Sequence, residues 1–420
     1  MKRFQISEQR VTQMMQSLIG SDDINLLEQS FARAAFSLIS EPGDRFAGTL
    51  IELLSPALVL QLLVNKSDED EFRSQLCARE GMQQVEDKFG SLSSALEDAK
   101  QRWLPRLKLN ELLIALESAL ARRARLLTPE SACWPSKLND LEDSRPHCLW
   151  AVGQDIETAL SQSSISIVGS RNSTSYGEWV TSEIVADSTS RGLAIVSGGA
   201  YGIDAIAHRS ALALDEVTIA FMAGAIDRLY PSGNAAIFER ITKRGVLLAE
   251  QAPGASPTKW RFLQRNRLIA ALGEATIVVE AGQRSGALNT VTHALALGRE
   301  VGVIPGAITS QSSAGCNRLI SEGLVTSICQ TSQAADLALG SAGWFQQELA
   351  GLGAFETRAL DALDFRAMSE SRVASRAGLT SRELAIALGQ LSLLGLVKQT
   401  DKGWLKLPLE NEQRAEAGGK

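Results

Sequence analysis

The chain has 420 residues, a formal net charge of −6, and 45% hydrophobic and 21% charged residues. This length allows two to four domains, and the acidic balance argues against blanket binding to nucleic acid without excluding a local basic pocket. No apolar run approaches the ~20 residues that span a bilayer, and the amino terminus lacks a secretory pattern. The five cysteines show no CxxC spacing. We therefore expect a cytoplasmic protein with no disulfide framework, no metal site and no membrane partner.

Residues 1–126 are predicted to form a helical domain behind a polar lead-in. Apolar residues recur at three- and four-residue spacing in 34–39, 49–63 and 107–121, which is the spacing of one helix face. A helix-hairpin-helix would bind phosphates through a Gly-x-Gly turn, and the sequence around Gly81 does not supply one. Packing or assembly is therefore the favoured role of this domain.

Residues 127–330 are predicted to form a Rossmann-like α/β domain with a doubly wound parallel sheet. Residues 127–163 suggest a lead-in with an edge strand, after which strands alternate with helices up to about residue 306. The strand candidates are apolar runs typical of strands buried on both faces, at 165–168, 193–196, 217–222, 246–248, 276–279 and 301–304. The helix candidates are 176–191, 203–213, 234–243, 265–272 and 288–297.

Small residues follow the first two of these strands. Gly169 and Ser170 end the first strand, and Ser197, Gly198 and Gly199 end the second. Both turns belong to the carboxyl edge of a parallel sheet, where such sheets bind ligands. Glycine lets a ligand approach the backbone, and free N–H groups at the following helix starts favour anionic oxygens. The pattern predicts a phosphate-binding edge.

A short basic section follows at 259–267 in this otherwise acidic chain. Single-strand binders combine charge for the backbone with rings for the bases, and this section interleaves the two. The alternative interpretation makes the rings core side chains and the arginines a solvated face. It loses weight because Arg171 and Gly198 are expected at the same sheet edge. The section contains Lys259, Trp260, Arg261, Phe262, Arg265 and Arg267, and Arg284 follows it.

The remaining chain is predicted to hold a linker at 331–354, a winged-helix-like domain at 355–408 and a disordered tail at 409–420. Three helical patterns followed by a ribbon give the winged-helix outline. Its would-be recognition helix, 380–394, is too apolar for a major groove, where polar side chains must meet base edges. A protein partner or intramolecular packing suits that helix better.

Ordered motifs along residues 130–330 resemble the DprA/Smf family of DNA-processing proteins. They include Ile-Val-Gly-Ser-Arg at 167–171, Ser-Gly-Gly-Ala at 197–200, Arg-Asn-Arg at 265–267 and Glu-Ala-Gly at 280–282. The resemblance implies a single-stranded-DNA-binding protein that protects incoming strands and loads the RecA recombinase in natural transformation. It also implies a homodimer, no cofactor and a SAM-like helical amino-terminal domain. Three positions depart from the family's frequent residues, namely Leu263, Gly273 and Asn289.

The residues and the resemblance together predict a DNA-binding site without catalytic or metal-binding residues. Cations are expected to meet phosphates, and the glycines to offer backbone N–H groups. The predicted site comprises Arg171, Ser197, Gly198, Gly199, Lys259, Arg261, Phe262, Arg265, Asn266, Arg267 and Arg284.

Two other classes of protein remain open. Nucleotide phosphoribohydrolases also hold a phosphate on a glycine-rich sheet edge, but their Pro-Gly-Gly-x-Gly-Thr turn with a following glutamate is absent from 281–287. A regulator that reads duplex DNA through the winged helix is disfavoured by the apolar helix 380–394. Structural roles are expected for the side chains that could otherwise suggest catalysis, which are Asp204, His208, Glu280, His293 and Cys316.

Overall fold

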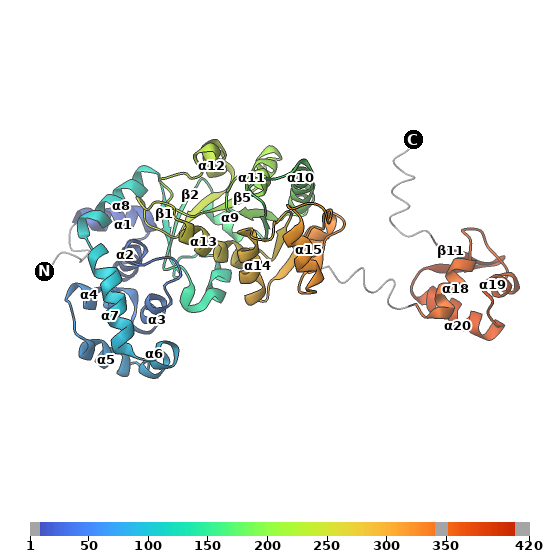
Figure 1. Cartoon of the computed structure of the whole chain (residues 1–420), viewed down its shortest axis with the longest axis horizontal. Helices are drawn as coiled ribbons and strands as arrows, with labels where there is room; N and C mark the ends of the chain where they lie inside the picture. The colour runs from blue at the N-terminus through green and yellow to red at the C-terminus, as the bar shows by residue number, and fades with distance from the viewer. Residues whose placement is uncertain (1–8, 341–351, 408–420) are drawn as a thin grey trace. The chain divides into compact units, whose positions relative to one another are not determined.

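The computed structural model describes residues 9–340 and 352–407. The chain divides into two compact units, Met1–Gly340 and Ser341–Lys420, and each is described by itself (Figure 1). The first unit contains a helical region and a large sheet. The second contains three helices and one hairpin within its described part.

The amino-terminal region is helical, as its spacing predicts. Asp23, Asp44 and Asp68 each accept a hydrogen bond from a backbone N–H of the helix that follows, which satisfies donors that lack a partner within the helix. The elements are α1 (Gln9–Ile19), α2 (Ile24–Ile39), α3 (Arg45–Leu54), α4 (Pro56–Val64), α5 (Glu69–Cys77), α6 (Met82–Phe89), α7 (Leu92–Trp103), η1 (Leu104–Arg106) and α8 (Leu109–Ala121).

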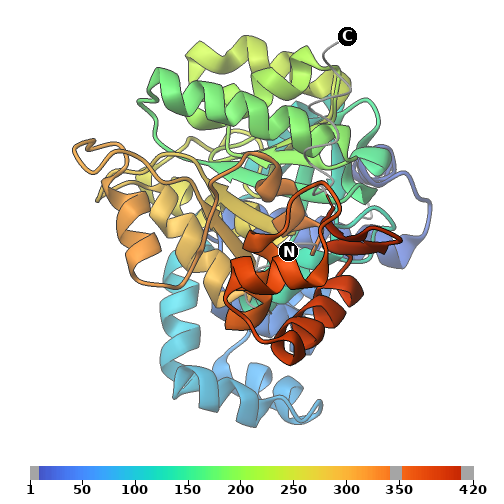
Figure 2. The same ribbon diagram turned by 90° about the vertical axis from the view of Figure 1, so that its right-hand side faces the viewer.

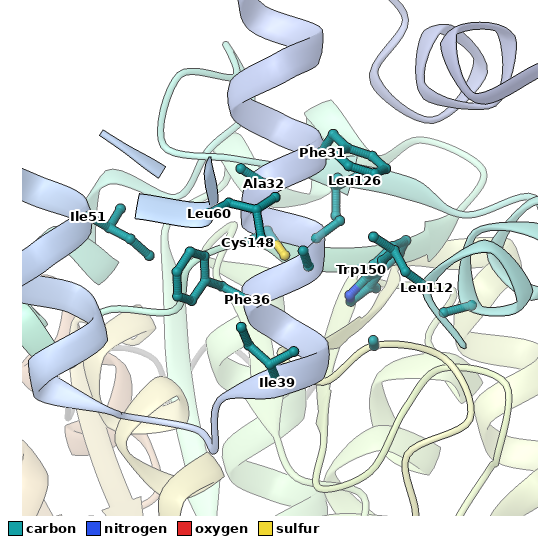
Figure 3. Close-up of a cluster of buried hydrophobic side chains, with 14 of the residues drawn as sticks. Phe31, Ala32, Phe36, Ile39, Ile51, Leu60, Leu112, Leu126, Cys148 and Trp150 are labelled. Atoms are coloured by element: carbon teal, nitrogen blue, oxygen red, sulfur yellow. The ribbon is translucent and has the colours of Figure 1, made fainter. Parts of the chain in front are cut away.

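Helix α2 joins this region to the sheet. Phe36 and Ile39 of α2 belong to the same buried cluster as Leu126 and Trp150, which lie on the first two strands (Figure 3). Trp150 Nε1 also donates to Ser37 Oγ at 3.2 Å. The helical region and one face of the sheet therefore share a core, which explains why they form one compact unit.

The sheet has nine strands in the order β1-β2-β6-β5-β4-β3-β7-β8-β9. The strands from β6 to β9 in this order pair in parallel, whereas β2 is antiparallel to both β6 and β1. Their bounds are β1 (Arg125–Leu127), β2 (Leu149–Gly153), β3 (Ser164–Val168), β4 (Ala194–Ser197), β5 (Thr218–Met222), β6 (Val246–Ala249), β7 (Ala275–Val278), β8 (Glu300–Val303) and β9 (Thr326–Ser327).

Helices cover both faces of the sheet (Figure 1). One face packs against α10 (Ser175–Ser190), α11 (Ile203–Ala213), α12 (Ala235–Arg244) and α16 (Ser332–Ala338), the first three of which lie together above the strands in Figure 2. The other face packs against η2 (Ser136–Ser144), α9 (Ile156–Ser161), α13 (Lys259–Leu272), α14 (Ala287–Ala296) and α15 (Ala314–Ser321). The short η3 (Ser232–Asn234) precedes α12.

The order in which the chain adds strands to the sheet reverses direction at β3. From this strand the connections run to β4, β5 and β6 on one side, and to β7, β8 and β9 on the other. The carboxyl ends of β3 and β7 are therefore neighbours whose following segments leave in different directions. Such a topological switch point is where open α/β sheets leave room for a ligand.

The second unit has its own small core, which includes Val373, Leu384 and Leu391. A capping box starts its third helix, because Thr380 and Glu383 each bond the other's backbone N–H. Its elements are α18 (Ala354–Ala362), α19 (Glu370–Ala377), α20 (Ser381–Leu393), β10 (Val397–Thr400) and β11 (Gly403–Lys406), with β10 antiparallel to β11.

The predicted fold class is confirmed: the chain is α/β, with a mostly parallel central sheet and a helical amino-terminal region. One correction concerns the segment predicted as a linker from residue 331. Its first part forms α16, and Ala334, Ala335 and Leu337 are buried against the sheet. The predicted tail at 409–420 lies outside the described residues. Among the described residues no single helix could cross a membrane, and α3 with α4 reach the required length only as a pair bent by 108°.

Candidate nucleic-acid interface

A cavity of about 890 Å³ lies at the carboxyl edge of the sheet, at the switch point between β3 and β7. We call it the switch-point cavity. Its walls come from the turn after β3, the start of α11, the loop after β5, the first turns of α13 and the turn before α14. The lining residues used below are Ser170, Arg171, Asp204, Tyr230, Thr258, Lys259, Phe262, Arg265, Asn266 and Arg284.

Three exposed cations stand around this cavity, namely Arg171, Lys259 and Arg284. They come from three different segments, so only the folded sheet brings them together. The guanidinium of Arg171 lies 5.0 Å from the ring centroid of Phe262, a cation–π contact that holds the arginine over the cavity wall. The mouth of the cavity is therefore positive and accessible.

Aromatic rings line the same wall. Tyr230 and Phe262 make an edge contact, with centroids 5.8 Å apart and planes at 66°. Tyr230 is 49% exposed, and Trp260, which lies in the first turn of α13 outside the cavity lining, is 54% exposed. Leaving rings of this size exposed to water is unfavourable. Stacking on a nucleobase would cover their flat faces, and the neighbouring cations suit the attached phosphates.

Arg265 forms the floor and is buried. Its Nη1 donates to the carbonyl oxygens of Gly198, at 2.6 Å, and of Phe221. Burial lowers the pKa of Arg265 to about 10, with the nearby charge of Asp204 acting in the opposite direction. The side chain thus remains charged at neutral pH, and it makes the cavity positive from below while direct contact with an anion is left to the exposed cations.

The anion site expected at the start of α10 is filled by the chain itself. The Glu280 carboxylate, which is 1% exposed, accepts hydrogen bonds from the backbone N–H of Thr174 at 2.9 Å, from its hydroxyl at 2.6 Å and from Ser312 Oγ at 3.3 Å. A Cβ on Gly177 would overlap this carboxylate. Glu280 therefore occupies the place that a ligand phosphate takes at other helix starts.

Asp204 fills the second expected anion site. Its carboxylate accepts from the backbone N–H of Ala200 at 3.3 Å and also from that of Gly198. Burial raises the pKa of Asp204, while the charge of Arg265 and these N–H groups act against the rise. Asp204 therefore takes up the N–H group of Gly198, which the sequence analysis expected to be open to a phosphate.

Comparison with known proteins agrees with this architecture. Residues 125–338 match the family described as DNA recombination-mediator protein A. A Mycobacterium tuberculosis chain described as a DNA processing protein DprA is 39% identical over 333 residues, which are 72% of this chain and 82% of that protein. The DNA processing protein DprA of Bacillus subtilis is 36% identical over 190 residues, 45% of this chain and 63% of that protein.

A solved structure supports the same assignment. The X-ray structure of DNA processing protein A from Streptococcus pneumoniae matches with a TM-score of 0.55 at 26% identity, covering 73% of this chain and 96% of that one. The chain belongs to the DprA family. Its relatives carry names that describe DNA processing, and the family itself is one of DNA recombination mediators.

Within this DprA-family fold, six of the predicted site residues line the switch-point cavity and five do not. Ser197 lies behind it and donates to the Ile167 carbonyl at 2.6 Å. Gly198 and Gly199 are buried under Arg265 and Phe238. The residues that do line the cavity are Arg171, Lys259, Phe262, Arg265, Asn266 and Arg284.

Arg267 requires a correction. Its side chain is 2% exposed and forms a two-pronged ion pair with Glu250, at 2.7 and 2.8 Å. Its remaining donors reach the carbonyl oxygens of Ser144 and Gln264. With every N–H group engaged in the interior, Arg267 has no donor for a phosphate, and its task is structural.

Arg261 and Asn266 also have partners within the protein. Arg261 pairs with Glu41 of the helical region at 3.0 Å and lines a different cavity. The Asn266 amide donates to the Gly286 carbonyl at 3.2 Å and to Asn289 Oδ1 at 3.3 Å. Asn266 thereby fixes the turn that carries Arg284, which is a positioning role.

Sequence reasoning missed Tyr230, and it expected structural roles for Asp204 and Glu280 without predicting that they occupy the backbone N–H groups at this edge. Tyr230 precedes a proline in the loop after β5, and an exposed ring beside proline is a signal that could have been used. For the side chains that might have suggested catalysis, the structure shows internal partners. His208 Nδ1 lies 2.7 Å from Thr218 Oγ1, and Cys316 is buried. Among residues 9–340 and 352–407, no group of three or more His, Cys, Asp or Glu side chains could hold a metal ion.

Proposed function

We propose that the switch-point cavity binds single-stranded DNA. The observation that carries this proposal is the ring of Arg171, Lys259 and Arg284 around a cavity of about 890 Å³ that also presents aromatic faces. The cations suit a phosphodiester backbone, whereas the rings suit unpaired bases. A duplex hides its bases in the stack, so rings at the mouth favour a single strand.

We further propose the partners that membership of the DprA family suggests. The chain would act in the cytoplasm, protect incoming strands and load the RecA recombinase onto them during natural transformation. It would do so as a homodimer, with a winged-helix-like carboxyl-terminal domain. A mediator of this kind presents DNA to a second protein, which agrees with a cavity that stays open on one side.

The protein is proposed to bind DNA without altering it. Asp204 lines the cavity and Glu280 caps the neighbouring helix α10, and both carboxylates are engaged by backbone or hydroxyl donors. Neither is free to act as a general base or nucleophile in this arrangement. We expect no turnover of nucleoside monophosphates, the reaction that a phosphoribohydrolase would catalyse.

A salt titration tests the DNA proposal. Affinity for a single-stranded oligonucleotide is measured over a range of salt for the wild-type chain, Lys259→Ala and Arg284→Ala. Each substitution should weaken binding about three- to tenfold and reduce the salt slope by about 0.7, the contribution of one phosphate contact. Base sequence should not change these effects, since backbone contacts carry no sequence information.

Arg244→Ala is the matched control, because Arg244 is a half-exposed arginine at the end of α12 that does not line the cavity. Equal losses for the control and the cavity variants, or tighter binding of duplex than of single strand, would contradict the proposal. Recombinase loading is then measured as the rate of RecA filament formation on strands coated with single-strand-binding protein.

A further inference from the structure

A second cavity, of about 330 Å³, lies on the other side of the loop that precedes α13. We call it the side cavity. Residues 252–255 of this loop line the side cavity, and Pro257, Thr258 and Lys259 line the switch-point cavity. The residues that line the two cavities are thus consecutive along this loop. A ligand long enough to leave one cavity over the loop therefore reaches the other.

Two arginines from different regions converge in the side cavity. Arg261 comes from α13 and Arg106 from η1 of the helical region. A single carboxylate, Glu41, bridges them, accepting from Arg261 Nε and Nη2 at 3.0 Å each and from Arg106 Nη1 at 2.8 Å. Two anionic oxygens thus receive three N–H groups, which is the arrangement that arginines make with a phosphate.

The bridging carboxylate is within reach of solvent. The Glu41 side chain is 33% exposed and Arg106 is 45% exposed, so water or an anion can approach the bridge. Burial alone would raise the pKa of Glu41, but the hydrogen bonds and charges of Arg261 and Arg106 outweigh it and lower that pKa. The site is thus built to hold a negative charge. The Arg261 side of the bridge is largely buried, at 14% exposed, whereas the pair with Arg106 is open enough to solvent to be exchanged.

The surface between the two cavities suits a nucleobase. Trp260 lies in the turn that separates them and is 54% exposed, and Ile114 in the wall of the side cavity is 65% exposed. The ring of Trp260 and the apolar side chain of Ile114 thus accompany the two arginines, and the one further acid in the lining, Glu111, is paired with Lys108. Continuity and charge therefore point to the same ligand.

We propose that a single strand bound in the switch-point cavity crosses the first turn of α13 and continues into the side cavity, where a backbone phosphate replaces Glu41 between Arg106 and Arg261. This inference rests on the proposed function and extends it. It makes the helical region part of the DNA-binding surface, and it gives Glu41 the role of an internal competitor that favours long strands over short ones.

The test compares oligothymidylates from about 4 to about 20 nucleotides, a range that spans the usual site sizes, by fluorescence anisotropy with the full chain. Arg106→Ala should lower the affinity for long oligonucleotides about two- to fivefold and leave the affinity for the shortest ones unchanged. Glu41→Gln removes the competing carboxylate and should raise the affinity for long oligonucleotides by a similar factor. Lys259→Ala should weaken all lengths alike.

Arg79→Ala and Glu28→Gln are the matched controls, since they make the same charge changes on exposed positions of the helical region outside the side cavity. If the wild-type chain binds single strands while Arg106→Ala and Glu41→Gln behave like these controls at every length, the extension is wrong and the proposed function stands. If no length binds to the wild-type chain, the proposed function fails and the extension with it. Thermal unfolding of each variant confirms that the chain is folded.

Discussion

Arg265 and Arg267 lie two residues apart on α13, and both are buried. Arg265 donates to the backbone carbonyls of Gly198 and Phe221, has no carboxylate partner among its hydrogen bonds, and faces the switch-point cavity. Arg267 points to the opposite side and pairs with Glu250, which itself accepts from the Gly43 N–H at 3.4 Å. The first arginine contributes charge to the cavity, whereas the second ties the helix, strand β6 and the helical region together.

Removing Arg267 should therefore affect stability and not DNA binding. Arg267→Met leaves the Glu250 carboxylate buried without its counter-ion, which costs about 3–5 kcal/mol of unfolding free energy. The measurement is the urea midpoint, with the salt slope of single-strand binding recorded on the folded fraction. The double variant Arg267→Met with Glu250→Leu should regain part of the loss, because no uncompensated charge remains. If Arg267→Met is as stable as the wild-type chain and its single-strand binding depends less on salt, Arg267 contacts a phosphate and this account is wrong.

At the scale of elements, the start of α10 depends on a residue from a distant strand end. Glu280 follows β7, yet its carboxylate caps α10 through Thr174. The helix and the strand come together only because Gly177 has no side chain at the point of closest approach. The contact fixes the wall of the switch-point cavity that carries Arg171.

Gly177→Ala should therefore destabilise the protein, although alanine favours helices. The gain in helix propensity is about 1 kcal/mol at most, and it is smaller in a first turn. Overlap with a buried carboxylate costs about 1–3 kcal/mol and also breaks its hydrogen bonds. Gly286→Ala is the control, because its added Cβ meets no atom within 4 Å. The measurement is the unfolding midpoint of each variant. If both variants raise the midpoint above the wild-type value, or both lower it, this account is wrong.

The elements show where sequence patterns suffice and where they do not. The strands of the parallel core were predictable because each is a short, mostly apolar run, whereas β9 has only two residues and gives no pattern. Helix α13 begins at Lys259, six residues before the predicted start, because its first turn lacks an apolar period. The Thr258 side chain, which caps the helix, was the available signal.

The position of the switch-point cavity was predictable, whereas the residues that line it were less so. Glycines after strands and cations on the next segments indicated the carboxyl edge, and the cavity is there. Which arginine faces the solvent depends on partners far away in sequence, such as Ser144 for Arg267 and Glu41 for Arg261. No local pattern around residues 259–267 records those partners.

At the scale of the whole molecule, the two units have separate cores. Both cavities and all proposed DNA contacts belong to the first unit. A chain that ends at Gly340 should fold and keep single-strand affinity within about twofold. The measurement is a binding curve for the truncated chain after its folding is confirmed by circular dichroism. A loss of more than about tenfold, ~1.4 kcal/mol, would show that the second unit is itself a DNA-binding surface.

Two buried histidines predict how stability depends on pH. Burial lowers the pKa of His147 and of His208 to about 3, with neighbouring arginine charges adding to the effect. Unfolded histidine titrates near 6.5, so below that pH the unfolded chain binds protons that the folded chain does not. The free energy of unfolding should fall by about 2 kcal/mol per histidine between pH 7 and pH 5.

Urea midpoints at pH 7, 6 and 5 measure this loss. The variant His208→Gln should lose less stability on acidification than the wild-type chain, whatever its stability at pH 7, because one of the two groups no longer titrates. Other groups contribute equally to both chains, so the difference isolates the histidine. Parallel pH profiles for the two proteins would show that His208 is not buried in its neutral form.

The carboxylates of Glu280 and Asp204 have a consequence for the protein's surroundings. A living cell holds free ATP and GTP at concentrations far above those of any DNA end, and α/β sheets of this kind often seat their triphosphates on open helix starts. Here the donors at both starts are already engaged by carboxylates of the chain itself, so a small polyphosphate finds no open N–H groups where it would need them. We expect the protein's occupancy to follow the supply of DNA strands and to be insensitive to the energy status of the cell.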